Sequence, residues 1–141
     1  PVSIEREIFP EMALAETLYA MKSDTYWLDT GTPEQFLEAN LDALRGRRKN
    51  KPTLPVAAVD ATAQVEDSVI GTGTHIGAEA IVKRSVLFAG CQVSKGVTII
   101  DSVLSDDVHV GEGARIERSV IGLGERISAG TQLVEQTRPE P

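Results

Sequence analysis

The chain has 141 residues, of which 41% are hydrophobic and only 4% aromatic, and its net charge is −7. This acidity argues against a general nucleic-acid-binding protein, and no run of about 18 apolar residues is present to cross a membrane. With one cysteine there is no disulfide framework within the chain, so we expect a reducing, cytoplasmic location.

The first 30 residues carry signals for one helix and two strands. Ser3 predicts the N-cap of a short helix, which Pro10 should kink or restart. Residues 18–21 and 26–28 are rich in aromatic and aliphatic side chains and predict two short strands around a turn.

A second helix is predicted to begin at Thr32. Thr32 would be its N-cap, Pro33 its first residue, and Gln35 the partner that completes a capping box, with Gly46 after its end. Its apolar face would bury Phe36, Leu37, Leu41 and Leu44. Two short strands and two helices cannot enclose a core. We therefore expect residues 1–50 to be the C-terminal remnant of a larger α/β domain with a basic linker.

From Val65 onward the chain repeats itself every 17 residues. The large aliphatics that mark this period are Val65, Val82, Ile99, Ile116 and Leu133. Within each repeat the aliphatics are spaced by 5, 6 and 6 residues, which excludes a helix, and a small residue lies two positions before nearly every one. In a strand those two positions share a face, so each repeat predicts three short strands that form one triangular coil of a parallel solenoid.

This pattern resembles the hexapeptide-repeat family, which implies a left-handed parallel β-helix over residues 56–136. An incomplete first coil would place Val59 and Ala63 inward. Glycines follow the inward aliphatics at bends, where we expect positive φ angles. These glycines are Gly71, Gly77, Gly111 and Gly122. Cys91 falls at a small inward position and is expected to be a core thiol.

The most informative short motif runs from Trp27 to Pro33 and contains Asp29. Here a carboxylate ends a predicted strand, and a tight turn leads into a capped helix. Ligands gather at such strand ends in α/β sheets, and Mg²⁺ binds through one or two carboxylates plus substrate phosphates. Asp29 is therefore either a metal ligand or a residue that merely stabilises the turn, and the pattern alone favours the turn.

Two runs of sequence carry a further resemblance. They are S-I-E-R-E-I-F-P-E-M (3–12) and Y-W-L-D-T-G-T-P-E-Q-F-L-E-A-N (26–40), followed by the 17-residue solenoid. Together they resemble the C-terminal part of sugar-phosphate nucleotidyltransferases of the mannose-1-phosphate guanylyltransferase type. The resemblance implies an enzyme that uses Mg²⁺ to join a nucleoside triphosphate to a sugar 1-phosphate. GTP is the nucleotide that the resemblance favours.

In that family the Asp of the W-x-D-x-G-T motif binds the catalytic Mg²⁺, and this role would fall to Asp29. Trp27, Gly31 and Thr32 would shape the substrate site around it. The family's N-terminal Gly-rich phosphate-binding signature and its other metal carboxylate do not occur in this sequence. Because phosphoryl-type transfer needs several groups together, we expect the chain to be inactive by itself.

A hexapeptide acyltransferase is the alternative enzyme class. Such enzymes use a histidine as general base at a subunit boundary, and His75 and His109 lie two coils apart on one predicted outward column with Gln92 and Arg126. A plain surface column is the favoured explanation of these residues. No long loop interrupts the coils to form a tunnel for an acyl donor, which further weakens this alternative.

A non-catalytic assembly module is the third alternative. Four valines occupy one outward column, which we call the valine stripe: Val69, Val86, Val103 and Val120. Because a contiguous apolar stripe is unusual on a solvated surface, it predicts an interface. We expect the helix at 33–45 or a missing domain to dock there, with homo-oligomerisation as a second use.

Overall fold

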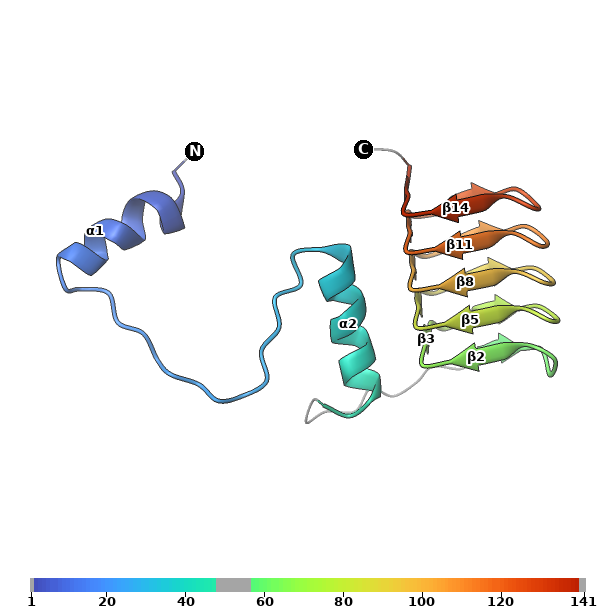
Figure 1. The fold of residues 1–141 in the computed structure, drawn as a ribbon, viewed down its shortest axis with the longest axis horizontal. Helices are drawn as coiled ribbons and strands as arrows, with labels where there is room; N and C mark the ends of the chain where they lie inside the picture. The colour runs from blue at the N-terminus through green and yellow to red at the C-terminus, as the bar shows by residue number, and fades with distance from the viewer. Residues whose placement is uncertain (1, 48–56, 140–141) are drawn as a thin grey trace.

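The computed structural model describes residues 2–47 and 57–139, which form a helical N-terminal part and a mainly β solenoid of five coils. Figure 1 shows the coils stacked in chain order, with α2 (Pro33–Leu44) alongside them and α1 (Phe9–Leu14) well apart at the end of an extended segment. The linker at 48–56 lies outside the described residues.

Three parallel sheets form the walls of the solenoid, and each contains one short strand from every coil. Sheet 1 contains β1 (Ala58–Val59), β4 (His75–Ile76), β7 (Gln92–Val93), β10 (His109–Val110) and β13 (Arg126–Ile127). Sheet 2 contains β2 (Gln64–Glu66), β5 (Ile81–Lys83), β8 (Thr98–Ile100), β11 (Arg115–Glu117) and β14 (Gln132–Val134). Sheet 3 contains β3 (Val69–Ile70), β6 (Val86–Leu87), β9 (Val103–Leu104), β12 (Val120–Ile121) and β15 (Thr137–Arg138). The predicted parallel solenoid is confirmed.

The repeat sets the register, because each paired residue lies one period from its partner. Val65 pairs with Val82, and Leu87 with Leu104. The aliphatics of the predicted repeat that are buried in the core are Ile70, Ile76, Val82, Leu87, Val93, Ile99, Leu104, Val110, Ile116, Ile121, Ile127 and Leu133. Val59 has the inward register that the sequence predicts, opposite Ile76, but it is 46% exposed. It lies in the first coil, where only one neighbouring coil covers it.

A ladder of buried serines holds one corner of the triangle. In each of the first four coils the serine hydroxyl donates to the carbonyl two residues earlier, as Ser102 does to Ile100 at 2.7 Å. The same oxygen accepts the backbone N–H one period later, as from Ser119 at 3.1 Å. The small inward residue predicted at this corner therefore both saves space and satisfies buried backbone groups. The ladder consists of Ser68, Ser85, Ser102 and Ser119.

The glycines at bends have a different role from the one predicted. Positive φ angles occur instead at other glycines, such as Gly73 and Gly96. At Gly71 a Cβ would lie 2.4 Å from the carbonyl carbon of Phe88 in the next coil. The same crowding by backbone of a later coil occurs at Gly77, Gly111 and Gly122. The prediction of positive φ was wrong, because these positions require close approach between coils.

The N-terminal helix forms as predicted, but the strands do not. Ser3 accepts a hydrogen bond from the N–H of Arg6 at the start of a π-helical segment, η1 (Ile4–Ile8), and an α-helical segment with Pro10 in its first turn follows. Residues 18–21 and 26–28 contain no strand. A two-stranded hairpin is marginal without further strands to pair with, and the described chain supplies none here.

Both ends of α2 have the caps that the sequence predicts. Thr32 and Gln35 form the reciprocal capping box. At the other end Gly46 has φ = 75°, and the N–H of Arg47 donates to the carbonyl of Asp42 at 2.9 Å, which makes a Schellman motif. Within the described residues, none of the helices has the length and apolarity needed to cross a bilayer.

Candidate functional site

Helix α2 packs on the valine stripe. Leu37 and Leu41 are buried in one cluster with Val86 and Val103, and Phe36 and Val69 are partly buried at its edge. The apolar face of α2 thus lies over the first three valines. Val120 is only half-buried, one coil beyond the helix contact.

An aromatic pair extends this contact. The rings of Phe36 and Phe88 stack with centroids 6.1 Å apart. Phe88 was not among the residues singled out from the sequence. A signal was present, because the equivalent positions in neighbouring coils hold the small residues Gly71, Ser105 and Gly122, whereas this coil has a phenylalanine there.

Two polar connections hold the C-terminal half of α2. Arg45 pairs with Glu38 at 3.1 Å and donates through Nε to Asp67 of the solenoid at 3.3 Å. Asp42 is only 5% exposed and receives two hydrogen bonds at 2.9 Å, from Arg47 and from the phenol of Tyr26. Sequence reasoning missed these contacts, since no local pattern indicates a pairing 16 or 22 residues apart.

The motif around Asp29 forms a turn directly before α2. The N–H of Gly31 donates to Oδ1 of Asp29 at 3.1 Å, and Thr32 begins the helix. Asp29, Gly31 and Thr32 therefore lie in one exposed turn. Trp27, which precedes this turn, is 81% exposed. No group of three or more potential metal-ligating side chains occurs in the described part of the chain.

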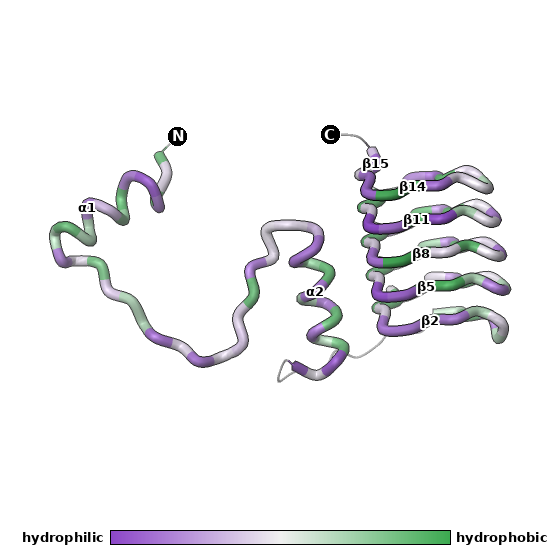
Figure 2. Tube along the Cα trace, viewed as in Figure 1, coloured by the Kyte–Doolittle hydropathy of each residue, from purple (hydrophilic) through white to green (hydrophobic). Residues whose placement is uncertain are grey.

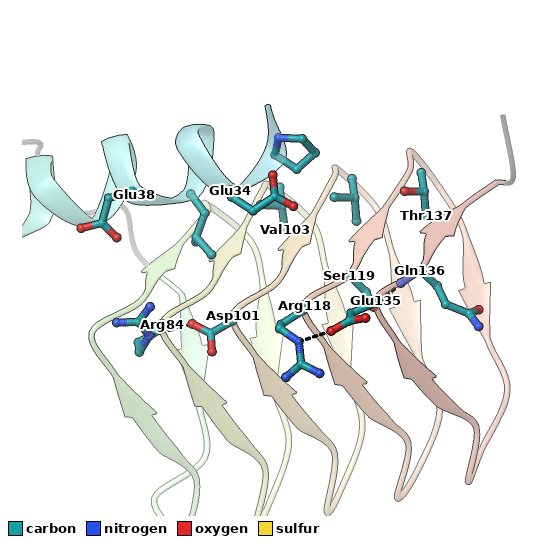
Figure 3. Close-up of a pocket in the computed structure, with 13 residues that line it drawn as sticks. Glu34, Glu38, Arg84, Asp101, Val103, Arg118, Ser119, Glu135, Gln136 and Thr137 are labelled. Atoms are coloured by element: carbon teal, nitrogen blue, oxygen red, sulfur yellow. Dashed lines mark hydrogen bonds and ion pairs between the residues drawn. The ribbon is translucent and has the colours of Figure 1, made fainter. Parts of the chain in front are cut away.

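Two hollows lie between α2 and sheet 3. The smaller, of about 280 Å³, is lined by the turn at 30–32 together with Phe36, Val103 and Val120. The larger, of about 680 Å³, lies beside Leu37 and continues over the last two coils of sheet 3. Figure 3 shows its charged rim, with Arg84, Asp101, Arg118 and Glu135 along one side and Glu34 and Glu38 of α2 opposite.

The charged rim belongs to one corner of the solenoid, which we call the corner column: Asp67, Arg84, Asp101, Arg118 and Glu135. All five residues have φ angles between 43° and 54°, a region that L-residues visit rarely. Their signs alternate along the stack. Arg84 pairs with Asp101 at 2.6 Å and Arg118 with Glu135 at 2.9 Å, so ion pairs of this column join the second coil to the third and the fourth coil to the fifth.

The histidines and the cysteine lie elsewhere. His75, Gln92, His109 and Arg126 form the outward column of sheet 1 that the sequence predicts. His75 is exposed and His109 half-buried. Cys91 is fully buried in the core, and burial raises the pKa of its thiol above the ordinary value. The sequence-based expectation of a core thiol is confirmed.

A family model described as "GlmU-like, C-terminal hexapeptide" matches residues 54–138. The chain belongs to this family. The GlmU-like hexapeptide match covers the whole solenoid, from β1 to β15.

Curated relatives of this GlmU-like hexapeptide chain extend the similarity. It is 36% identical over 108 residues to "Probable mannose-1-phosphate guanylyltransferase 2" of Arabidopsis thaliana, a match that covers 70% of this chain and 30% of the relative. It is 35% identical over 111 residues to "Mannose-1-phosphate guanylyltransferase" of Mycobacterium tuberculosis, covering 70% and 31%. The chain thus spans about a third of the length of these relatives, and the similarity is longer than the solenoid match.

Proposed function

We propose that this chain is the C-terminal portion of a nucleotidyltransferase that makes a nucleotide-sugar. The product that we propose is GDP-mannose, made from GTP and mannose 1-phosphate. The observation that carries the proposal is the similarity to relatives named for this activity, which extends past the hexapeptide solenoid. In this proposal residues 1–50 belong to the catalytic part and residues 56–136 support packing and assembly.

Asp29 is proposed as one ligand of Mg²⁺. Its carboxylate is exposed and uses Oδ1 for the N–H of Gly31. This fits a metal that takes one or two carboxylates and fills its remaining positions with water and substrate phosphates. Bound there, Mg²⁺ would neutralise charge on the phosphates during transfer. Trp27, Gly31 and Thr32 would line the substrate side of the same turn.

The remaining parts of the proposal concern assembly and location. Val120 and the larger hollow leave part of the valine stripe open beyond α2, which supports its use in homo-oligomerisation. A single buried cysteine supports a reducing, cytoplasmic location. The acyltransferase and the purely structural module are not favoured, because the relatives are named as guanylyltransferases.

The test joins this chain to the upstream portion that the relatives possess and measures pyrophosphate release from GTP and mannose 1-phosphate with Mg²⁺. We expect the joined enzyme to be active and the isolated chain to be inactive. Asp29→Asn should remove most of the activity, because the amide carries no charge to offer the metal. Asp24→Asn is the matched control, an exposed aspartate in the same segment. Full activity in Asp29→Asn would refute the metal role.

A further inference from the structure

We propose that the hydrogen bond between Tyr26 and Asp42 is a positioning contact that holds the 27–31 loop against α2 and thereby sets the place of Asp29. The proposal rests on the proposed function, in which Asp29 binds Mg²⁺. In this arrangement Tyr26 and Asp42 act on the metal site without contacting the metal, and the solenoid fixes the site through them.

The loop is attached to α2 at both ends. At its start the phenol oxygen of Tyr26 donates to Oδ2 of Asp42 at 2.9 Å, and at its end the capping box joins Thr32 to Gln35. Between these attachments the N–H of Gly31 donates to Asp29, which closes the turn. The five residues from 27 to 31 are thus a short span between two fixed points on one helix, although Trp27 and Asp29 are exposed.

Asp42 is suited to be the fixed point. Its side chain is 7% exposed, and its two oxygens are divided between partners, with Oδ1 accepting from Arg47 and Oδ2 from Tyr26, both at 2.9 Å. Hydrogen bonds to a carboxylate are stronger than those between neutral groups, and two partners from different sides hold the carboxylate in one orientation. The Tyr26 hydroxyl is therefore held at the last turn of α2.

The helix is in turn fixed to the solenoid. Leu41, adjacent to Asp42 in the chain, has no exposed surface and belongs to the cluster that contains Val86 and Val103. Sheet 3 thus fixes the position of α2. Helix α2 holds Tyr26 through Asp42, and Tyr26 in turn holds the loop that contains Asp29. This series of contacts gives the solenoid a part in catalysis without any contact with substrate.

The first arm of the test needs no activity. Trp27 is the only tryptophan of this chain, so the fast component of its time-resolved fluorescence anisotropy reports local motion of the loop, and the slow component reports tumbling of the whole chain. We expect Tyr26→Phe, which removes only the hydroxyl, to increase the amplitude of fast local motion at Trp27. Tyr19→Phe is the matched control, since Tyr19 is the other tyrosine and is 88% exposed. An unchanged Trp27 anisotropy in Tyr26→Phe would overturn the proposal.

The second arm uses the joined enzyme. Loss of an outer contact that orients a metal ligand commonly costs about 10- to 100-fold in metal affinity. We expect Tyr26→Phe to raise the Mg²⁺ concentration for half-maximal rate by roughly tenfold or more, with the KM for mannose 1-phosphate at saturating Mg²⁺ little changed. A looser Trp27 with unchanged Mg²⁺ dependence, while Asp29→Asn is inactive, would overturn the positioning role and leave the proposed function standing. Full activity in Asp29→Asn would instead remove the proposed function, and with it this role.

Discussion

The ring of Phe36 stacks on the ring of Phe88, with centroids 6.1 Å apart and planes inclined by 12°. One ring comes from α2 and the other from the residue that follows β6, so the pair joins the N-terminal part to the solenoid. It adds to the apolar contact between Leu37, Leu41 and the valine stripe. Docking of the helix therefore uses a side chain that stands outside the repeat.

Replacing Phe88 by Ala should loosen α2 without unfolding the coils. An aromatic pair contributes about 0.5–1.5 kcal/mol beyond its buried area, and Phe88 is itself partly exposed. We expect faster hydrogen exchange in the amides of α2 and unchanged exchange in β6 and β9. Phe9→Ala is the control, because Phe9 lies on α1 away from the solenoid (Figure 2). Equal protection of α2 in both variants would contradict this prediction.

Changing Val86 and Val103 together to Lys should release α2. Both valines are buried against Leu37 and Leu41, and a buried ammonium group without a partner is strongly unfavourable. We expect residues 1–55 to become sensitive to protease while the coils remain folded. Sedimentation in the same variant tests whether the stripe also holds an oligomer.

The control for that variant places the same charges on another wall. Gln92 and His109 point outward from sheet 1, away from α2. Gln92→Lys with His109→Lys should leave protease sensitivity and sedimentation unchanged. If the Val86 and Val103 double variant behaves in the same way, the stripe is only a surface and its docking role is wrong.

Leu104→Ala should destabilise the solenoid by about 2–5 kcal/mol, as for other large-to-small core changes. Leu104 has no exposed surface and lies in the central coil, where neighbouring coils restrict collapse around the cavity. Denaturant unfolding monitored by circular dichroism measures the loss. Leu123→Ala is the control, because Leu123 is 72% exposed. A loss below about 1 kcal/mol at Leu104 would show that the site relaxes freely.

The solenoid could be predicted from the sequence because its geometry depends on contacts one period apart. Each coil places the same residue types at the same points, so spacing alone determines the core, the register and the small corner residues such as Ser102. The bends were harder. Gly71 is required by the backbone of Phe88 in the next coil, and a distance between coils is not visible in one repeat.

The N-terminal part could be predicted only where its contacts are local. The capping box of Thr32 and the end of α2 at Gly46 depend on residues three to five positions away. The prediction of a hairpin at 18–28 was wrong because a strand needs a hydrogen-bonded neighbouring strand. The β propensity of these residues does not provide one. The contact between Tyr26 and Asp42 joins a loop to a helix through tertiary geometry, which no local pattern encodes.

The corner column has a consequence for how the chain assembles during folding. A 17-residue period gives every coil an equivalent set of aliphatics, so a coil that skipped its neighbour and stacked on the next would bury the same kind of core. Alternating signs make that error unfavourable, since skipping one coil would place Asp67 beside Asp101 and Arg84 beside Arg118. Like charges directly opposite each other are destabilising, whereas the native order pairs Arg84 with Asp101 and Arg118 with Glu135. The alternating charges of the corner column therefore favour the native order of the coils, which the equivalent sets of aliphatics do not specify by themselves.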